Sequence, residues 1–303
     1  MKSRSGLIEI HSAVFLFGLA GLFGKWITLS PVFIVLGRVF FASTALFLLL
    51  QISRKSVLIY PRSNYFYLFL MGILLAVHWI TFFQSIQIST VSIGLLSFST
   101  YPMFTTLFEP LLTSEKFVKI NLLFSALCIL GVYLIVPRFD LADSGFKGVI
   151  WGLASGFTFA LLTIMNRRFS QIYSSPVIAF YQDLFAFLVL LPFPFILSFE
   201  LTGQNLILLA VLGVVCTATS HTLFIQGMKT IKAQTASIIH ALEPVYGIIF
   251  AFILLREIPA LRTILGGIII LAAQVIILFS LQDHLKSEDR RQKDRRQKIE
   301  DRK

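Results

Sequence analysis

The sequence predicts an all-α integral membrane protein in which ten transmembrane helices form an inverted repeat of five plus five. Apolar residues fill 56% of the 303 positions and only 14% are charged, whereas soluble domains carry roughly a quarter of charged residues. The apolar residues fall into runs of about twenty, the length that one helix needs to cross a bilayer. A register of 142 positions relates the second half of the chain to the first.

Ten apolar runs follow one another along the chain, separated by short polar connections. Each run is too long and too uniformly apolar for a strand of a membrane barrel, so each is expected to form a helix. The first run follows a short basic segment without a clear small-residue cleavage site, and we expect it to be the first helix rather than a removed signal. The expected spans are 8–29, 32–52, 65–86, 90–113, 118–136, 145–166, 176–200, 205–228, 233–255 and 260–282.

Lysine and arginine are distributed unequally between the two sides that these spans define. With the N-terminus inside, the inner segments hold twenty of the 26 Lys and Arg and the outer segments hold five. Cytoplasmic loops of membrane proteins carry such an excess. We therefore expect a multi-pass protein of the cytoplasmic (inner) membrane with its N- and C-termini in the cytoplasm. The same distribution accounts for the net charge of +11, so nucleic acid is not an expected partner.

The charged segment 283–303 carries nine of these basic residues and is predicted to be a disordered cytoplasmic tail. The two cysteines, Cys128 and Cys216, lie singly in apolar runs and indicate neither a disulfide nor a metal site. The expected partners are the lipid bilayer and a small-molecule substrate, with proton coupling as a further hypothesis. No metal or other cofactor is expected, and the sequence carries no indication of an oligomeric state.

The register of 142 positions superposes a first repeat, 8–136, on a second repeat, 145–281, and aligns Pro102 with Pro244. It also aligns Phe82 with Phe224, Gln84 with Gln226, Gly18 with Ala160 and Lys25 with Arg167. Because each repeat holds an odd number of spans, the second must enter the membrane from the opposite side, which relates the repeats by a two-fold axis in the membrane plane. Two such halves can exchange conformations, which is the physical basis of alternating access.

The motifs of both halves resemble the EamA family of the drug/metabolite transporter superfamily. The similar segments are PMFTTLFEPLLTSE with CILGVYLIV in the first repeat and PVYGIIFAFILLRE with ILGGIIILAAQVIIL in the second. The spacing from Gly18 to Lys25, and Arg38 in the second span, extend the resemblance. It implies a secondary transporter, not an enzyme, that exports a small organic metabolite such as an amino acid or a related amphipathic solute. The register aligns Tyr101 of the first repeat with Glu243 of the second, so the cavity is not expected to be chemically symmetric.

Charged side chains within spans are candidates for function, because an ionised group at the bilayer centre costs roughly 2.5–3.5 kcal/mol on insertion scales. Glu243 is the deepest, and Pro244 after it removes a helix hydrogen bond. We predict Glu243 as a substrate contact or proton-coupling group, with a neutral or structurally paired carboxyl as the alternative. Arg38 and Asp183 each lie seven residues after a proline in the second span of their repeat. They are predicted as a structural ion pair or as gating or proton-coupling groups.

Polar and aromatic residues near these positions are predicted to line a cavity at the bilayer midplane between the repeats. Pro102 and Pro244 are predicted to break their helices and to act as hinges, with ordinary kinked packing as the alternative. Buried histidines either line the cavity, sense pH or are satisfied within the bundle, and their spacing does not fit a metal site. An intramembrane enzyme that uses the buried His and Glu groups, or a channel, remains the alternative function. The predicted substrate-binding residues are Tyr101, Glu243, His78, Trp79, His221, Gln84 and Gln226.

Overall fold

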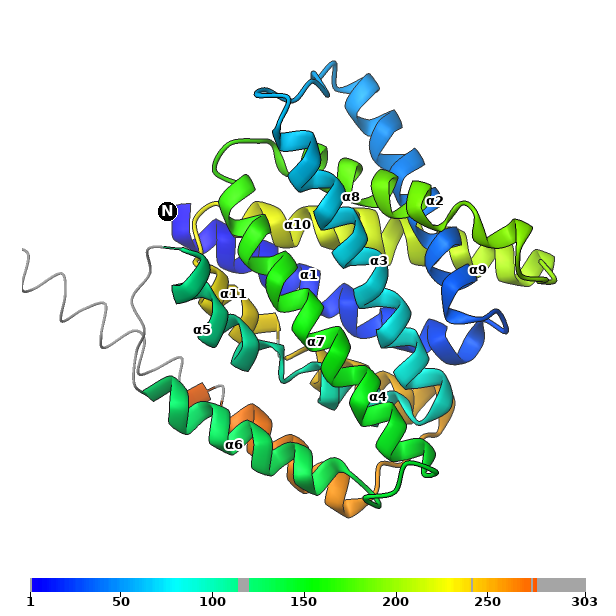
Figure 1. Cartoon of the computed structure of the whole chain (residues 1–303), viewed down its shortest axis with the longest axis vertical. Coiled ribbons are helices and arrows are strands. Elements are labelled where there is room, and N and C mark those ends of the chain that lie inside the picture. Colours follow the sequence, from blue (N-terminus) through cyan, green and yellow to red (C-terminus); the bar gives the residue numbers. More distant parts are fainter. Residues whose placement is uncertain (1, 114–119, 241, 274, 277–303) are drawn as a thin grey trace, which may run out of the picture.

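The computed structural model describes residues 2–113, 120–240, 242–273, 275 and 276, and over this part of the chain it contains helices and no strands (Figure 1). Among these described residues, eight helices are long and apolar enough to span a membrane, and the shorter apolar helices Leu123–Ile135 and Leu261–Ala273 accompany them. This architecture confirms the predicted all-α membrane fold. The predicted tail 283–303 lies outside the described residues.

The elements follow the expected spans, but the fourth, eighth and ninth spans are composite. In chain order they are α1 (Lys2–Trp26), α2 (Pro31–Ile52), α3 (Asn64–Ile88), α4 (Val91–Phe98), α5 (Tyr101–Leu112), α6 (Ile120–Ile135), α7 (Ser144–Phe169), α8 (Ser175–Leu190), the 3₁₀ turn η1 (Phe193–Phe195), α9 (Gly203–Gly213), the π-helical η2 (Val214–Thr219), α10 (Ser220–Gly227), α11 (Ala233–His240), α12 (Glu243–Phe250), the π-helical η3 (Ala251–Leu255) and the helix Leu261–Ala273.

Several helices begin at side chains that cap their free backbone N–H groups. The side chains of Thr90, Asp143 and Thr202 each accept a hydrogen bond from the backbone N–H three residues on, at the starts of α4, α7 and α9. Such caps satisfy donors that have no partner within the helix. Pro31 and Pro176 lie in the first turns of α2 and α8, where a missing N–H costs nothing.

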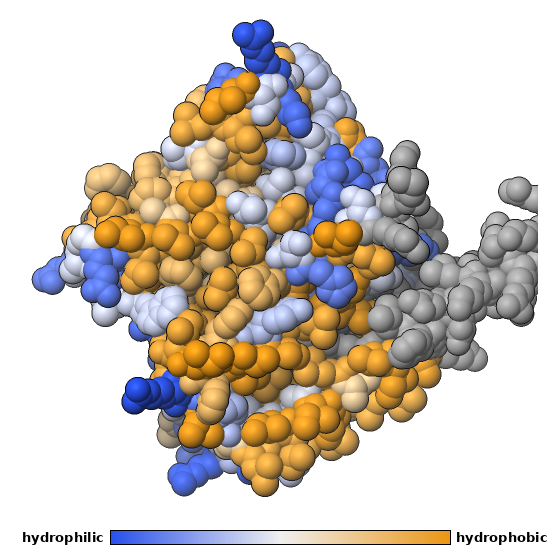
Figure 2. Space-filling model, turned by 180° about the vertical axis from the view of Figure 1, so that it is seen from behind, coloured by the Kyte–Doolittle hydropathy of each residue, from blue (hydrophilic) through white to orange (hydrophobic). Residues whose placement is uncertain are grey.

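The outer surface is apolar over a wide area, as Figure 2 shows for one face. Large side chains such as Phe47 and Leu48 on α2, Phe66 on α3 and Ile129 on α6 are exposed. A water-soluble monomer rarely exposes contiguous apolar surface of this extent. Together with the apolar helices, this surface is that of a multi-pass membrane protein.

The end of α1 lies beside the end of α3 and the start of α7. Lys25 Nζ, at the end of α1, donates a hydrogen bond of 2.8 Å to the carbonyl oxygen of Ser89, just after α3. Ser85 Oγ, near the end of α3, donates one of 2.6 Å to the carbonyl oxygen of Gly148, near the start of α7. These contacts place the first turns of α7 on the side of the molecule where α1 finishes.

The opposite end of the molecule shows the reverse arrangement. Arg167, in the last turn of α7, donates a hydrogen bond to the carbonyl oxygen of Met228 at the end of α10. Gly6, in the first turns of α1, packs so closely on α10 that a Cβ atom on Gly227 would lie 2.7 Å from the Gly6 carbonyl oxygen. Helices α1 and α7 therefore run in opposite directions, as an inverted repeat requires.

Lys25 and Arg167 are equivalent in the two repeats, and they form equivalent contacts. Each cation ends the first span of its repeat and binds a carbonyl at the end of the third span. The last carbonyl groups of a helix have no partner within the helix and carry partial negative charge, so a cation there is favourable. Lys25 and Arg167, which the sequence register aligns, thus each join the end of the first span to the end of the third span in their own repeat.

The contacts of the second spans correct one detail of the sequence alignment. A Cβ atom on Gly72 of the third span would lie 3.1 Å from the carbonyl oxygen of Gln182, and one on Gly213 of the eighth span would lie 2.6 Å from that of Arg38. These matching contacts make Gln182 the counterpart of Arg38, whereas the proline spacing pointed to Asp183. The reason is the helix start: α2 begins at its proline, but α8 begins one residue before its own.

Helix α6 packs on the helix Leu261–Ala273 through two glycines, along the lower edge of Figure 1. A Cβ atom on Gly131 would lie 2.8 Å from the carbonyl oxygen of Gly266. We expect Gly131→Leu to lower the stability of the purified protein by roughly 1–3 kcal/mol, measured as thermal unfolding in detergent, because the backbones must separate. The control is Gly203→Leu, since no heavy atom lies within 4 Å of a Cβ there. Equal losses in both variants would contradict the close contact.

Candidate functional site

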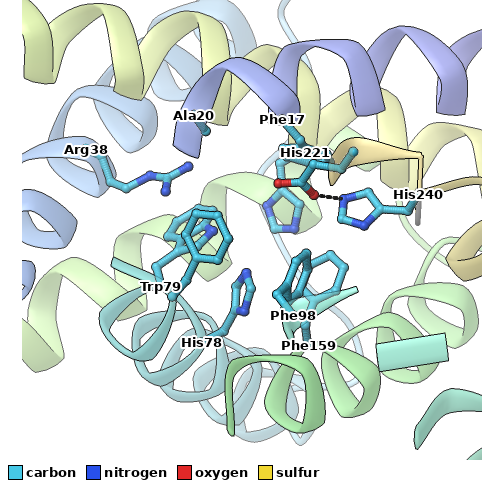
Figure 3. A pocket seen from close by; sticks show the side chains of 11 residues that line it. Phe17, Ala20, Arg38, His78, Trp79, Phe98, Phe159, His221 and His240 are labelled. Carbon is cyan, nitrogen blue, oxygen red and sulfur yellow. Dashed lines mark ion pairs between the residues drawn. The ribbon is translucent and has the colours of Figure 1, made fainter. Parts of the chain in front are cut away.

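A small buried cavity lies where the two repeats meet at the centre of the bundle (Figure 3). Its volume is about 20 Å³, and a water molecule needs roughly 10–15 Å³ measured in the same way. In this closed state the cavity therefore has room for about one water. The residues that line it come from both repeats: Phe17, Ala20, Arg38, His78, Trp79, Phe82 and Phe98 from the first, and Phe159, His221, His240 and Glu243 from the second.

Two interrupted spans, the fourth and the ninth, reach the cavity at their breaks. Phe98 and His240 are the last residues of α4 and α11, and Glu243 is the first residue of α12; all three line the cavity. Pro102 and Pro244 are the second residues of the helices that follow, where proline is tolerated because its missing N–H would be unpaired anyway. The helices are thus interrupted at the predicted prolines, and the hinge role of these prolines stays a prediction.

Arg38 extends from α2 toward the cavity, and its guanidinium is fixed on two sides. The Nε–H donates a hydrogen bond of 3.0 Å to Thr217 Oγ1, and the guanidinium carbon lies 3.6 Å from the centre of the Trp79 ring. Within the described structure, neither terminal nitrogen of Arg38 has a hydrogen-bond partner, although the side chain is 1% exposed. The site therefore contains a buried, oriented cation with two unused donor nitrogens.

The position of Thr217 follows from the π-helical segment η2. Its Oγ1 donates a hydrogen bond of 2.7 Å to the carbonyl oxygen of Leu212, five residues earlier. Gly213, just before this segment, allows the backbone to approach the carbonyl of Arg38. Single π-helical turns inside α-helices are frequent at functional sites. Here the turn supplies the acceptor that orients the arginine.

The carboxyl group of Glu243 lies next to the His240 ring across the helix break. The distance between Glu243 Oε2 and His240 Nε2 is 3.2 Å, marked by the dashed line in Figure 3. Glu243 is the first residue of α12, and the partial positive charge of a helix N-terminus lies beside its carboxyl group. The His240 ring stacks on Phe159 with 5.0 Å between centroids and meets Phe17 edge-on. The carboxyl group of Glu243 and the imidazole of His240 thus lie side by side, and the imidazole packs on Phe159 and Phe17.

The other two histidines of the cavity differ in their bonding. His78 Nδ1 lies 2.8 Å from Ser155 Oγ and 3.2 Å from the carbonyl oxygen of Ser155, which fastens this ring to α7. Neither ring nitrogen of His221 has a hydrogen-bond partner among the described residues, and the side chain is buried. In that same part of the chain, no group of three His, Cys, Asp or Glu is arranged to hold a metal ion.

Four of the seven predicted substrate-binding residues, His78, Trp79, His221 and Glu243, line the cavity together with Arg38. The other three lie outside its lining in this closed state. Tyr101 is buried and donates a hydrogen bond of 2.8 Å to the carbonyl oxygen of Ser237. Gln226 accepts one of 2.7 Å from Ser175 Oγ, and Gln84 is half-buried on α3. Their contact with a substrate stays a prediction.

Asp183 lies on α8, fully buried, and does not belong to the cavity lining. Among the described residues it forms no ion pair with Arg38, and neither of its carboxylate oxygens has a hydrogen-bond partner. The predicted structural ion pair is therefore not formed in this state. The terminal nitrogens of Arg38 on α2 and the carboxyl oxygens of Asp183 on the neighbouring helix α8 are therefore all buried without a hydrogen-bond partner among the described residues.

Sequence reasoning missed six lining residues, and the internal repeat could have found four of them. Phe17 and Phe159 are 142 positions apart, as are Phe98 and His240, so each pair occupies equivalent places in the two repeats. A cavity on the axis between two repeats is lined by such pairs. Ala20 and Phe82 complete the missed set, and neither carries a charge or polar group that would mark it.

Polar contacts join helix ends of the molecule on both sides of the cavity. At one end, Glu257 Oε2 accepts a hydrogen bond of 2.9 Å from the N–H of Val91, and its Oε1 accepts bonds of 2.9 and 2.7 Å from the N–H and Oγ of Ser92. At the other end, Gln171 Nε2 donates a bond of 3.3 Å to the carbonyl oxygen of Met228, the acceptor that Arg167 also uses. The cavity therefore lies between two sets of polar contacts, one at each end of the bundle.

Two repeats that run in opposite directions, with a buried cavity between them in an apolar helical bundle, form an architecture typical of membrane transporters. The chain belongs to the EamA-like transporter family, whose model matches residues 4–136 and again 146–279. It is similar to an uncharacterized transporter of Archaeoglobus fulgidus, 30% identical over 65% of this chain and 70% of the relative. The uncharacterized transporter YxxF of Bacillus subtilis is 22% identical over 93% of this chain and 92% of its own length.

A solved structure, titled only as the crystal structure of a protein, superposes with a TM-score of 0.69 over 92% of this chain and 98% of that chain. At 17% sequence identity this likeness shows the fold alone. Family and relatives point to a transporter rather than an enzyme.

Proposed function

We propose that this protein is a secondary transporter that exports a small organic solute, such as an amino acid or a related amphipathic metabolite, from the cytoplasm by alternating access. The observation that carries the proposal is the buried cavity, which is lined by both repeats and lies between two sets of polar contacts, one at each end of the bundle. In an inverted repeat, the two halves can exchange conformations at similar energy, which opens the same cavity to one side and then to the other.

The excess of basic residues in the predicted inner segments supports a protein of the cytoplasmic membrane with both termini in the cytoplasm. With that orientation, the contacts of Glu257 close the outer end and those of Arg167 and Gln171 close the inner end. A cavity that holds about one water cannot hold an organic solute, so one end must open before binding.

The test is counterflow in proteoliposomes that contain the purified protein. A thermal-shift screen against a metabolite library selects the solute, and vesicles loaded with unlabelled solute are then given a trace of labelled solute outside. We expect saturable uptake of label that is accelerated by the internal solute, because one carrier conformation must return occupied. Uptake that rises linearly with concentration and ignores the internal solute would favour a channel.

An intramembrane enzyme remains the second candidate, because His240, Glu243 and two further histidines do converge on one cavity. Acid–base chemistry would further require these groups to lie within hydrogen-bond reach of one bound molecule. The same counterflow experiment separates the two functions. A transporter returns the labelled solute chemically unchanged, whereas an enzyme releases a product that chromatography resolves from it.

A further inference from the structure

The least satisfied group in the cavity is the guanidinium of Arg38. It is buried to 1% exposure on α2, and neither terminal nitrogen has a hydrogen-bond partner in the described part of the chain. A buried cation with unused donor nitrogens is unfavourable, because the charge has lost its water, and the carboxyl groups of Glu243 and Asp183 lie near Arg38 without a hydrogen bond to it. Since Arg38 lines the cavity between the repeats, an anion that enters this cavity would meet both unused nitrogens.

The guanidinium is held in one orientation before any ligand arrives. Its Nε is bonded to Thr217 Oγ1 at 3.0 Å, and its face lies on the Trp79 ring, with Phe83 at 5.4 Å. These contacts occupy the Nε–H and one face of the planar guanidinium. The two terminal nitrogens remain available to a ligand. An arginine fork in this arrangement matches the two oxygens of a carboxylate side by side, which a lysine ammonium cannot do.

Protein carboxylates do not take this place in the closed state. Glu243 Oε2 lies 3.2 Å from His240 Nε2, and within the described residues neither Glu243 nor Asp183 forms an ion pair with Arg38. His78 and His221 line the same cavity and are the other titratable groups beside it. The remaining walls are aromatic, from Phe17, Phe82, Phe98 and Phe159. The cavity thus combines one open cationic fork with the Glu243 carboxyl group, three imidazoles and aromatic walls.

We propose that Arg38 is the anchor for a carboxylate group of the transported solute, with the aromatic walls packed on the apolar body of that solute. The inference rests on the proposed transport function and names its substrate class: a small organic carboxylate. Both carboxylate oxygens accept from the terminal nitrogens of Arg38 while Thr217 and Trp79 keep the fork in place. The carboxylate enters when one end of the molecule opens, because the closed cavity is too small for it.

Trp79 provides a readout at the site itself, because its ring lies against the guanidinium. The chain has three tryptophans, so Trp26→Phe with Trp151→Phe leaves Trp79 as the fluorophore. The probes are two pairs of nearly isosteric molecules that differ in charge: benzoate with benzamide, and 3-phenylpropanoate with 3-phenylpropanamide. We expect the carboxylates to change Trp79 fluorescence saturably, with an apparent Kd roughly 10- to 100-fold below that of their amides, as for charge-assisted hydrogen bonds.

Substitutions at the fork assign this preference to Arg38. Arg38→Gln is expected to abolish the difference between carboxylate and amide, and Arg38→Lys to retain part of it, because the charge stays but the paired donors are lost. Thr217→Val keeps the arginine and removes the acceptor for Nε. A several-fold loss of the carboxylate preference in this variant would show that Thr217 positions the guanidinium of Arg38. Arg168→Gln, at an exposed position on α7, is the matched control and should leave the preference unchanged.

The result that overturns the inference is a wild-type protein that responds equally to each carboxylate and its amide, or a preference that survives Arg38→Gln. Should Arg38→Gln fail to fold, Arg38→Lys and Thr217→Val carry the test, and an undiminished preference in both overturns the inference equally. Failure of the transport proposal looks different. A protein with a carboxylate preference but no counterflow binds without transporting, and one with counterflow but no such preference transports without this anchor.

Discussion

Replacing Glu257 with glutamine is expected to open the central cavity toward the side on which α1 ends. The Glu257 carboxylate follows the ninth span and accepts three hydrogen bonds of 2.7–2.9 Å from Val91 and Ser92 at the start of α4. It thereby joins the second repeat to the first and places an anion at a helix N-terminus, where the helix dipole favours it. Glutamine offers one acceptor oxygen and an amide that cannot accept, so at least one of these charge-assisted bonds is lost.

Loss of one hydrogen bond to a charged group costs about 1.5–3 kcal/mol, which corresponds to a roughly 10- to 100-fold larger open population when the open state is the minor one. The reporter is Ala20→Cys, which places a thiol in the cavity, in a chain whose two native cysteines are replaced by serine. The measurement is the rate of labelling by a membrane-impermeant thiol reagent. We expect Glu257→Gln to raise the rate from the outer side by that factor.

The matched control is Glu200→Gln, the same chemical change at an exposed carboxylate on the predicted outer side. Its labelling rate should equal that of the parent. Labelling from the inner side should fall or stay constant in Glu257→Gln, because alternating access opens one end at a time. Unchanged outer labelling, or a rise from both sides together, would mean that the Glu257 bonds do not hold the outer end closed.

The sequence predicted the fold because the signals for it are strong and local. Spans of about twenty apolar residues follow from the bilayer thickness, and the odd number of spans in each repeat requires the inversion. The helix interruptions also follow from local chemistry, since Pro102 and Pro244 cannot continue a helix from the preceding turn. Helix starts are less certain from sequence, and this shifted the counterpart of Arg38 from Gln182 to Asp183.

The site was predicted in part, because side-chain direction is set by packing rather than by residue type. His78, Trp79, His221 and Glu243 line the cavity as expected, whereas Gln226 binds Ser175 on α8. The π-helical turn that supplies Thr217 to Arg38 has no signature in VVCTAT, and it follows the close contact of α9 with α2 at Gly213. Such a contact between distant segments is not readable from either segment alone.

Glu243→Gln is expected to abolish proton-coupled accumulation while exchange of the solute continues. Glu243 is 3% exposed and lies at the helix break, with its Oε2 3.2 Å from His240 Nε2. A carboxyl in this position can take up a proton when the cavity opens to one side and release it on the other. Glutamine keeps the size of the side chain and a hydrogen-bonding oxygen but cannot exchange a proton.

The size of the effect follows from the driving force. If one proton is exchanged for each solute, a gradient of one pH unit supplies about 1.4 kcal/mol and sustains roughly tenfold accumulation of the solute. In proteoliposomes with Glu243→Gln we expect this ratio to fall to about one, whereas counterflow at equal pH on both sides persists. The split between the two assays separates loss of coupling from loss of binding or folding.

Asp183→Asn is the second variant, because Asp183 is a fully buried carboxyl that has no hydrogen-bond partner among the described residues. It lies outside the cavity lining, so the proposal assigns the coupling to Glu243 and expects Asp183→Asn to keep the pH-driven accumulation. Loss of accumulation in Asp183→Asn alone would move the coupling group to α8. Accumulation that is undiminished in both variants would remove Glu243 and Asp183 as the proton-coupling groups.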